Sequence, residues 1–192
     1  TATDYSSYLD SAEDTLSAAK ATYSVSSLAV ELISFDEGVD IVALAKNYPA
    51  LYSVPWFGCE GNACLSRFID DAPTQSAKLH VYGLEAASMP SDTYSSLSDR
   101  YFSLTSQPFS YYSACAYDAY WLYALSVIKA GSADAIDVKS VLPSVAECYV
   151  GASGWCKLNE DGDRYSQNYD IWGFDKVGAS VQLVQCGYYS SF

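Results

Sequence analysis

Positive charge is scarce in this sequence. Ten Lys and Arg residues stand against 23 Asp and Glu residues, which gives a formal net charge of −13, and charged residues make up only 17% of the chain. The few basic residues are scattered rather than clustered. Proteins that bind nucleic acid or anionic membrane surfaces rely on basic clusters. The composition therefore argues against both partners.

Histidine occurs once, as His80, and the cysteines lack the close C-x-x-C spacing of a zinc site. A Ser-His-Asp or Cys-His arrangement would have to use His80, which lies in a strand-like pattern, and no nucleophile-elbow motif is present. Walker and dinucleotide-binding motifs are also lacking. We therefore expect no enzymatic activity, no metal and no cofactor. A secreted hydrolase that uses paired carboxylates is the weaker alternative.

No apolar run is long enough to span a membrane, and no signal peptide is visible, so we expect any export signal to lie outside these residues. The six cysteines, an even number, favour disulfides and an oxidising compartment. Spacing suggests the pairs Cys59–Cys64 and Cys148–Cys156, which leaves Cys115 with Cys186. The expected location is extracellular or periplasmic.

Half of the residues are hydrophobic, which is enough for a sizeable core. Their spacing predicts three helices that alternate with three strands over the first 84 residues: Tyr5–Tyr23, Leu28–Ile33, Val39–Asn47, Leu51–Phe57, Ala63–Asp71 and Lys78–Leu84. Strands joined by helices imply a parallel sheet with right-handed crossovers. The predicted fold class is therefore α/β.

The pattern changes after Glu85, where three helices follow one another: 91–104, 112–130 and 135–148. Gly131 ends the middle helix, which is too apolar to face water, so we expect another polypeptide segment to cover it. Asp161-Gly162 predicts a hairpin turn. A calcium loop is the weaker reading, because the ligand spacing and closing glutamate of an EF-hand are lacking. A last short strand is predicted over 181–184.

A candidate binding residue follows the second predicted strand. After Phe57 come Gly58, Cys59, Glu60 and Gly61. Ligands of open α/β sheets bind at the carboxyl ends of strands, and glycines let the backbone approach a ligand closely. Glu60 could there meet a cationic group of a ligand. The alternative is that Glu60 is a solvated loop acid.

Five short motifs resemble, in order, landmarks of the type I periplasmic solute-binding proteins, the family that includes binding proteins for leucine, isoleucine and valine. The motifs are Asp4-Tyr5-Ser6, Phe35-Asp36-Glu37, Tyr117-Asp118-Ala119-Tyr120, Asn159–Arg164 and Tyr169-Asp170-Ile171-Trp172. The resemblance implies three-layer, parallel-sheet α/β lobes joined by a three-strand hinge. It also implies that the N-terminal half of the first lobe is absent.

The resemblance assigns residues 1–84 to the second lobe, 85–178 to a portion of the first lobe and 179–192 to a return segment. Glu60 matches a family position whose carboxylate pairs with the α-ammonium group of the ligand. Phe35, or Asp36 beside it, matches a second contact from the same lobe. The loops that hold the ligand carboxylate belong to the absent half, so the expected partners include the missing N-terminal portion or a second chain.

The function expected from this resemblance is an extracellular module that captures a small amino acid or related amide for an ABC importer or a receptor. The alternative is an extracellular structural or interaction domain on a degenerate binding-protein fold. In that case the surface, rich in the chain's 18 tyrosines, would do the work. The two hypotheses differ in whether Glu60 contacts a ligand.

Overall fold

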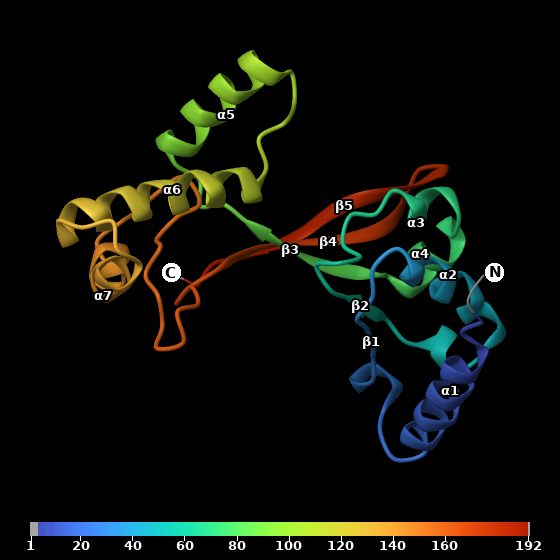
Figure 1. The fold of residues 1–192 in the computed structure, drawn as a ribbon. Coiled ribbons are helices and arrows are strands. Elements are labelled where there is room, and N and C mark those ends of the chain that lie inside the picture. The colour runs from blue at the N-terminus through green and yellow to red at the C-terminus, as the bar shows by residue number, and fades with distance from the viewer. Residues whose placement is uncertain (1–3, 192) are drawn as a thin grey trace. The chain divides into compact units, whose positions relative to one another are not determined.

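The computed structural model describes residues 4–191, and the chain forms two compact units. The first unit contains the residues up to Glu85 together with 170–188, and the second contains 86–169 with the C-terminal end. The chain passes between the units three times, within the strands β3, β4 and β5 (Figure 1). Each unit is described by itself.

The first unit has a mixed α/β fold, as the sequence predicts. Its helices are α1 (Ser6–Lys20), α2 (Glu37–Leu44), α3 (Arg67–Asp70) and α4 (Pro73–Leu79), and its strands are β1 (Val30–Leu32), β2 (Trp56–Gly58), β3 (Tyr82–Ala87), β4 (Asn168–Val177) and β5 (Ser180–Tyr189). The five strands form one sheet in the order β1-β2-β3-β4-β5. β1, β2 and β3 run parallel, and the two-residue turn at Gly178 joins β4 to β5.

The hydrophobic core lies in the first unit. Its largest fully buried apolar side chains are Trp56, Phe68, Leu51, Leu79, Val39, Val42 and Val81. The indole nitrogen of Trp56 donates a hydrogen bond of 2.9 Å to the carbonyl oxygen of Leu51, which satisfies the only polar atom of this side chain. The core therefore fixes β2, the strand that leads to Glu60.

Several predicted element boundaries are wrong in this unit, and the helix expected over Ala63–Asp71, for example, begins only at Arg67. The predicted strand Leu51–Phe57 begins only at Trp56, because Leu51–Ser53 form a 3₁₀ helix. The predicted strand Lys78–Leu84 begins only at Tyr82, and its first residues end α4 instead. His80 has a left-handed backbone with φ 46° and terminates that helix. A hydrophobic run alone did not distinguish these short turns from strands.

A carboxylate of α1 explains the turn before β2. The two carboxylate oxygens of Glu13 accept the backbone N–H groups of Ala50 and Leu51, at 2.8 and 2.9 Å. These are N–H groups at the start of a helical turn, which lack partners within the turn itself. Glu13 therefore attaches α1 to the chain segment that enters β2.

The second unit contains the three predicted helices, α5 (Asp92–Thr105), α6 (Tyr111–Ala130) and α7 (Ala135–Ala146). The side chains of Ser91, Ser110 and Asp134 cap their N-termini, and Gly131, with φ 65°, ends α6 as predicted. The turn 159–163 is held by the side-chain oxygen of Asn159, which accepts two backbone N–H groups. Among residues 4–191 no group of acidic, His or Cys side chains is arranged to hold a metal ion.

Helix α6 is largely uncovered within its own unit. Only Ala114, Asp118 and Ser126 are buried along its 20 residues, whereas Tyr120 and Ile128 are 77% and 76% exposed. The sequence predicts that this helix needs cover, and the described residues do not supply it. In the part of the chain that the structure describes, no helix combines the length and apolarity needed to cross a bilayer.

The predicted disulfides are absent from the structure, in which all six cysteines are free thiols. The thiols of Cys59 and Cys64 contact different groups, the carbonyl oxygen of Ser34 and the carboxylate of Glu85. Cys156 is buried beside Asp118, whereas Cys148 is exposed; Cys115 and Cys186 lie in different units. Spacing along the chain failed here because the direction of each side chain decides whether two sulfur atoms can bond.

Replacing Glu13 by Ala should lower the free energy of unfolding by about 1–3 kcal/mol, because the N–H groups of Ala50 and Leu51 lose their acceptors. Urea denaturation followed by circular dichroism would measure the loss. Asp14→Ala is the matched control, since Asp14 is the exposed neighbouring acid of the same helix and should change stability by less than about 0.5 kcal/mol. Equal effects of both substitutions would contradict the role given to Glu13.

Candidate ligand-binding site

The carboxyl ends of β1 and β2 lie at the same edge of the sheet, because the strands are parallel and Leu32 is opposite Gly58. The segment Ser34–Glu37 follows β1, and the segment Cys59–Asn62 follows β2. All three binding residues predicted from the sequence, Glu60, Phe35 and Asp36, are in these two segments. The sheet therefore brings together two loops that are separated in sequence.

The buried side chain of Asn62 joins the two loops. Its amide nitrogen donates to the carbonyl oxygen of Leu32 at 2.9 Å and to the hydroxyl oxygen of Ser34 at 2.8 Å. Its backbone N–H closes the turn by donating to the carbonyl oxygen of Cys59 at 3.2 Å. The thiol of Cys59 adds a contact of 3.3 Å to the carbonyl oxygen of Ser34. Three of these contacts, two from the side chain of Asn62 and one from the thiol of Cys59, thus hold the Glu60 turn against the chain at the end of β1.

Two glycines allow this close approach. A Cβ atom on Gly58 would lie 2.1 Å from the side-chain oxygen of Asn62, and one on Gly61 would lie 2.8 Å from the carbonyl oxygen of Ser34. The same position on Gly61 would be 2.9 Å from two ring carbons of Phe35, so the ring lies directly against the turn. Phe35 and the Glu60 turn are therefore neighbours, although 25 residues separate Phe35 from Glu60 in the chain.

All three predicted binding residues are exposed. Glu60 is exposed, and within residues 4–191 its carboxylate has no hydrogen-bond or ion-pair partner. Phe35 is 72% exposed, which leaves most of its ring open to a ligand. Asp36 is exposed at the start of α2, and its carbonyl oxygen accepts a 3.1 Å hydrogen bond from Arg67. Glu60, Phe35 and the carboxylate of Asp36 are thus all free to contact a solute.

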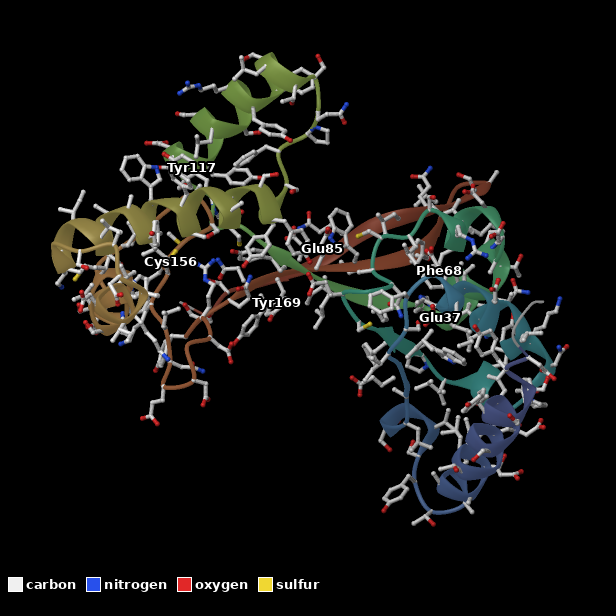
Figure 2. The ribbon with its side chains drawn as sticks, viewed as in Figure 1. Glu37, Phe68, Glu85, Tyr117, Cys156 and Tyr169 are labelled. Atoms are coloured by element: carbon white, nitrogen blue, oxygen red, sulfur yellow. The ribbon has the colours of Figure 1, made fainter. Side chains whose placement is uncertain are left out.

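Glu37, labelled in Figure 2, was not singled out from the sequence but supports the site. Its carboxylate accepts the backbone N–H of Phe35 at 3.0 Å, and this hydrogen bond lowers the pKa of the carboxyl group. The hydrogen bond therefore stabilises the loop fully when the pH is above the ordinary pKa of a glutamate. This stabilisation is lost as the pH falls through the lowered pKa of Glu37. An acid in the first turn of a helix after a strand is the sequence signal for this role.

The turn after β2 also packs on β3. Phe57 stacks on Tyr82 with ring centroids 5.6 Å apart, and Ala63 fits against Gly83, where a Cβ would lie 2.8 Å away. The thiol of Cys64 lies 3.5 Å from the carboxylate of Glu85. Burial and the negative charge of Glu85 raise the pKa of Cys64 to about 12. Cys64 is therefore a neutral thiol at physiological pH and a poor nucleophile.

The second unit contains a different carboxylate arrangement. Asp118, on the same face of α6 as Ala114, is buried and accepts the backbone N–H groups of Ala152 and Ser153 at 2.8 and 2.7 Å. The hydroxyl groups of Ser153 and Tyr149 also donate to it. Because these donors saturate the carboxylate, Asp118 anchors the loop 150–156 and has little capacity left for a ligand.

Arg164 completes this anchor. Its guanidinium donates to the hydroxyl oxygen of Ser153 at 2.8 Å and to the carbonyl oxygen of Trp155 at 2.6 Å. Asp118 and Arg164 both belong to the motifs that resemble the solute-binding family. Their contacts in this structure are structural, so these two motifs account for a loop conformation rather than a binding site.

The chain matches no protein-family profile and no curated protein. Solved structures do match. A leucine-binding protein of Thermotoga maritima has a TM-score of 0.64 and 14% identity, with 98% of this chain and 49% of that chain covered. A substrate-binding protein of Desulfitobacterium hafniense, in complex with Leu, has a TM-score of 0.56 and 13% identity over 92% and 48%. A solute-binding protein of R. palustris in complex with benzoate has a TM-score of 0.51 and 16% identity, with 94% of this chain and 46% of that chain covered.

These likenesses confirm the resemblance at the level of the fold: the chain has the α/β fold of ABC transporter solute-binding proteins. The chain spans about half the length of the structures that it matches. At 13–16% identity they say nothing about which solute this chain binds.

Gly58→Ala should lower stability by roughly 1–3 kcal/mol, because the new methyl group overlaps the side chain of Asn62 and breaks its hydrogen bonds to the end of β1. Thermal and urea denaturation would measure this. Gly187→Ala is the control, since its nearest neighbour would lie at 3.4 Å, an ordinary contact. A Gly58→Ala protein as stable as the control would mean that Asn62 does not hold the turn.

In the reduced protein Cys64 should react with iodoacetamide at least about tenfold more slowly than the exposed Cys148, because little of its thiolate is present. Mass spectrometry of the alkylated peptides gives both rates. Glu85→Gln should speed the reaction of Cys64 by removing the adjacent negative charge. Similar rates for Cys64 and Cys148 in the unchanged protein would refute the described environment of Cys64.

Proposed function

We propose that this chain is part of an extracellular or periplasmic solute-binding protein that captures a small amino acid or a related amide. Captured solute would pass to an ABC importer or to a receptor. The role is binding without chemical conversion of the solute. The matched solute-binding proteins are about twice as long as this chain. Residues 1–192 would therefore act together with a polypeptide segment that supplies the other half.

One observation carries the proposal. The turn after β2 presents an unpartnered carboxylate, Glu60, next to the exposed ring of Phe35, on a fold otherwise seen in solute-binding proteins. Carboxyl ends of parallel strands are where such sheets bind ligands. The backbone of this turn is fixed by Asn62, so the point from which the Glu60 side chain extends is set before a ligand arrives. Preorganisation of this kind lowers the entropic cost of binding.

The charge of Glu60 favours one class of solute. A carboxylate attracts an ammonium or amide N–H group and repels a ligand carboxylate, unless the latter is held elsewhere. One similar structure is described as a complex with Leu and another as a complex with benzoate, so the fold accepts both classes. An α-ammonium group supplies the positive partner that Glu60 requires, and benzoate does not. The apolar ring of Phe35 suits the aliphatic part of an amino acid.

The exposed aromatic residues of α6 support a second candidate function, an extracellular interaction domain on this fold. Tyr112, Tyr120, Trp121, Tyr123 and Ile128 are all exposed on that helix. Large exposed apolar areas mark interaction sites. Native mass spectrometry of the protein purified from its natural source separates the two functions, because an interaction domain would carry no bound small molecule.

Glu60→Gln should weaken binding of the retained solute by more than about 100-fold, since removing one partner of a desolvated charge pair costs about 3–5 kcal/mol. Isothermal titration calorimetry on the protein purified from its natural source, with the solute identified by mass spectrometry, gives the affinity. Glu160→Gln, which changes an exposed acid of the second unit, is the control and should leave affinity unchanged.

Melting of the solute-free protein should hardly respond to Glu60→Gln, because a solvated carboxylate without a partner contributes little to stability. Unchanged affinity together with unchanged melting would remove Glu60 from the site. The likeness to solute-binding proteins would then describe the fold only.

A further inference from the structure

A pocket of the first unit lies between α4 and the turn that joins β4 to β5. All of its lining residues belong to this unit. One wall is the face of α4 that carries Pro73, Ala77 and Lys78, and the other is the chain around Lys176 and Val181. The pocket has a volume of about 670 Å³, which is in the range of protein sites for small molecules. We call it the two-lysine pocket.

Much of the lining of the two-lysine pocket is apolar. Ile69, Pro73, Ala77, Ala179 and Val181 all line it. Ile69 and Val181 also pack against the hydrophobic core of the unit, which restricts the movement of their side chains. An apolar surface of this kind favours a ligand with an apolar body, because contact removes the apolar surface of both from water.

The two lysines place free positive charge at this pocket, although basic residues are scarce in the chain. Within residues 4–191 the ammonium groups of Lys78 and Lys176 have no hydrogen-bond or ion-pair partner. By contrast, Arg67 and Lys157 form ion pairs within the protein, and Arg164 donates to Ser153. Charged groups that the protein does not use for its own structure are available to a ligand.

Asp175 contributes the opposite charge to the same lining. One oxygen of its carboxylate accepts the backbone N–H of Lys176 at 2.7 Å, so this group is partly used within the chain. Two ammonium groups against one carboxylate leave one positive charge without compensation. Complementarity of charge therefore favours a ligand with a single negative charge.

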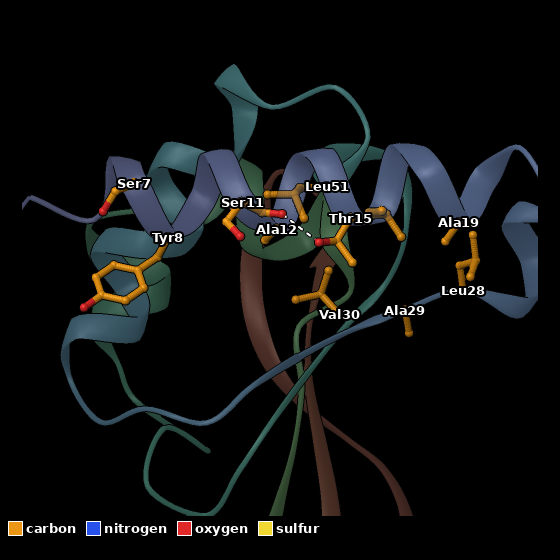
Figure 3. Close-up of a pocket in the computed structure, with 11 residues that line it drawn as sticks. Ser7, Tyr8, Ser11, Ala12, Thr15, Ala19, Leu28, Ala29, Val30 and Leu51 are labelled. Atoms are coloured by element: carbon orange, nitrogen blue, oxygen red, sulfur yellow. Dashed lines mark hydrogen bonds between the residues drawn. The ribbon is translucent and has the colours of Figure 1, made fainter.

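A second groove of this unit shows what the lysines add. The groove beneath α1, drawn in Figure 3, has a similar volume of about 700 Å³. Its lining includes Tyr8, Leu28 and Val30, and none of the described residues that line it is charged. An anion gains no attraction from such a lining, so this groove serves as an internal comparison.

We propose that the two-lysine pocket binds a small organic monoanion with an apolar body, namely an aromatic or branched aliphatic carboxylate. The apolar body lies against Ile69 and Val181, and the carboxylate pairs with the ammonium groups of Lys78 and Lys176. The charge preference is opposite to that of Glu60, which does not line this pocket. The site is therefore additional to the one proposed for the solute.

A matched pair of probes tests the class of ligand. Naphthalene-2-sulfonate carries one negative charge on an apolar body, and 2-naphthalenemethanol is its neutral counterpart. In a titration of the whole protein, followed by NMR of its Ile and Val methyl groups, the sulfonate should shift Ile69 and Val181 and leave Val30 unchanged. It should bind at least about fivefold more tightly than the alcohol, because two ammonium groups attract it.

Two results of this titration would overturn the proposal. Equal affinities for the two probes would show that the lysines do not select an anion. Shifts at Val30 without shifts at Ile69 and Val181 would place the sulfonate in the groove beneath α1. Since Lys78 and Lys176 are exposed, raising NaCl from about 0.05 M to about 0.5 M should weaken binding of the sulfonate and leave binding of the alcohol unchanged.

Substitution of both lysines tests their role. The double variant Lys78→Gln, Lys176→Gln should raise the Kd of the sulfonate at least about fivefold and that of the alcohol less than about twofold. Lys46→Gln is the control, because Lys46 is an exposed lysine of the same unit that does not line the pocket. Lys78 is in the last turn of α4, where a cation can also stabilise the helix. A lower melting temperature with an unchanged Kd would mean that the lysines have only that structural role.

The outcome is separable from that of the solute-binding proposal. Glu60→Gln should weaken binding of the solute and leave binding of the sulfonate unchanged, because Glu60 does not line the two-lysine pocket. A protein that binds no amino acid but binds the sulfonate through Lys78 and Lys176 refutes only the solute proposal. A protein that binds its solute but not the sulfonate refutes only the two-lysine pocket.

Discussion

The amide side chain of Asn62 is the interaction on which the geometry of the candidate site depends. It joins the end of β1 to the turn after β2 through two hydrogen bonds, in a position where water does not compete. Loss of a buried hydrogen bond is expensive, so these bonds favour the observed conformation of the turn. Gly58 and Gly61 are required by the same arrangement, because a side chain at either position would collide with Asn62, Ser34 or Phe35. The turn is thereby fixed without any contribution from Glu60.

The carboxylates near the sheet edge and in the second unit differ mainly in which groups of the protein donate hydrogen bonds to them. Glu37 accepts a backbone N–H, Glu85 lies against the thiol of Cys64, and Asp118 is surrounded by backbone and hydroxyl donors. These groups stabilise loops. The carboxylates of Glu60 and Asp36 differ from these, because both are exposed and neither has a partner among residues 4–191. Acids that the protein does not use for its own structure are available to a ligand, and of these two Glu60 is the one in the turn that Asn62 holds.

The two units are unequally built. The main apolar core, with Trp56 and Phe68, belongs to the first unit, whereas the long helix α6 of the second buries only Ala114, Asp118 and Ser126. Burial of apolar surface is the dominant stabilising term in folding, so an uncovered α6 leaves much of that free energy unused. The outer edge of β1 is likewise unpaired within the described residues.

The amino-acid sequence by itself determined the α/β class, the three helices after Glu85 and the position of Glu60 after a strand, because periodicity and capping residues are local signals. It did not determine where β2 and β3 begin, since Glu13 and His80 act there through a long-range hydrogen bond and a left-handed turn. Nor did it determine the state of the cysteines, because side-chain direction decides which thiols meet. Only the tertiary structure placed the ring of Phe35 against Gly61. It also gave Asp118 its hydrogen-bond donors and left Glu60 without any. The physical reason is that residues distant in sequence become neighbours only when the chain has folded.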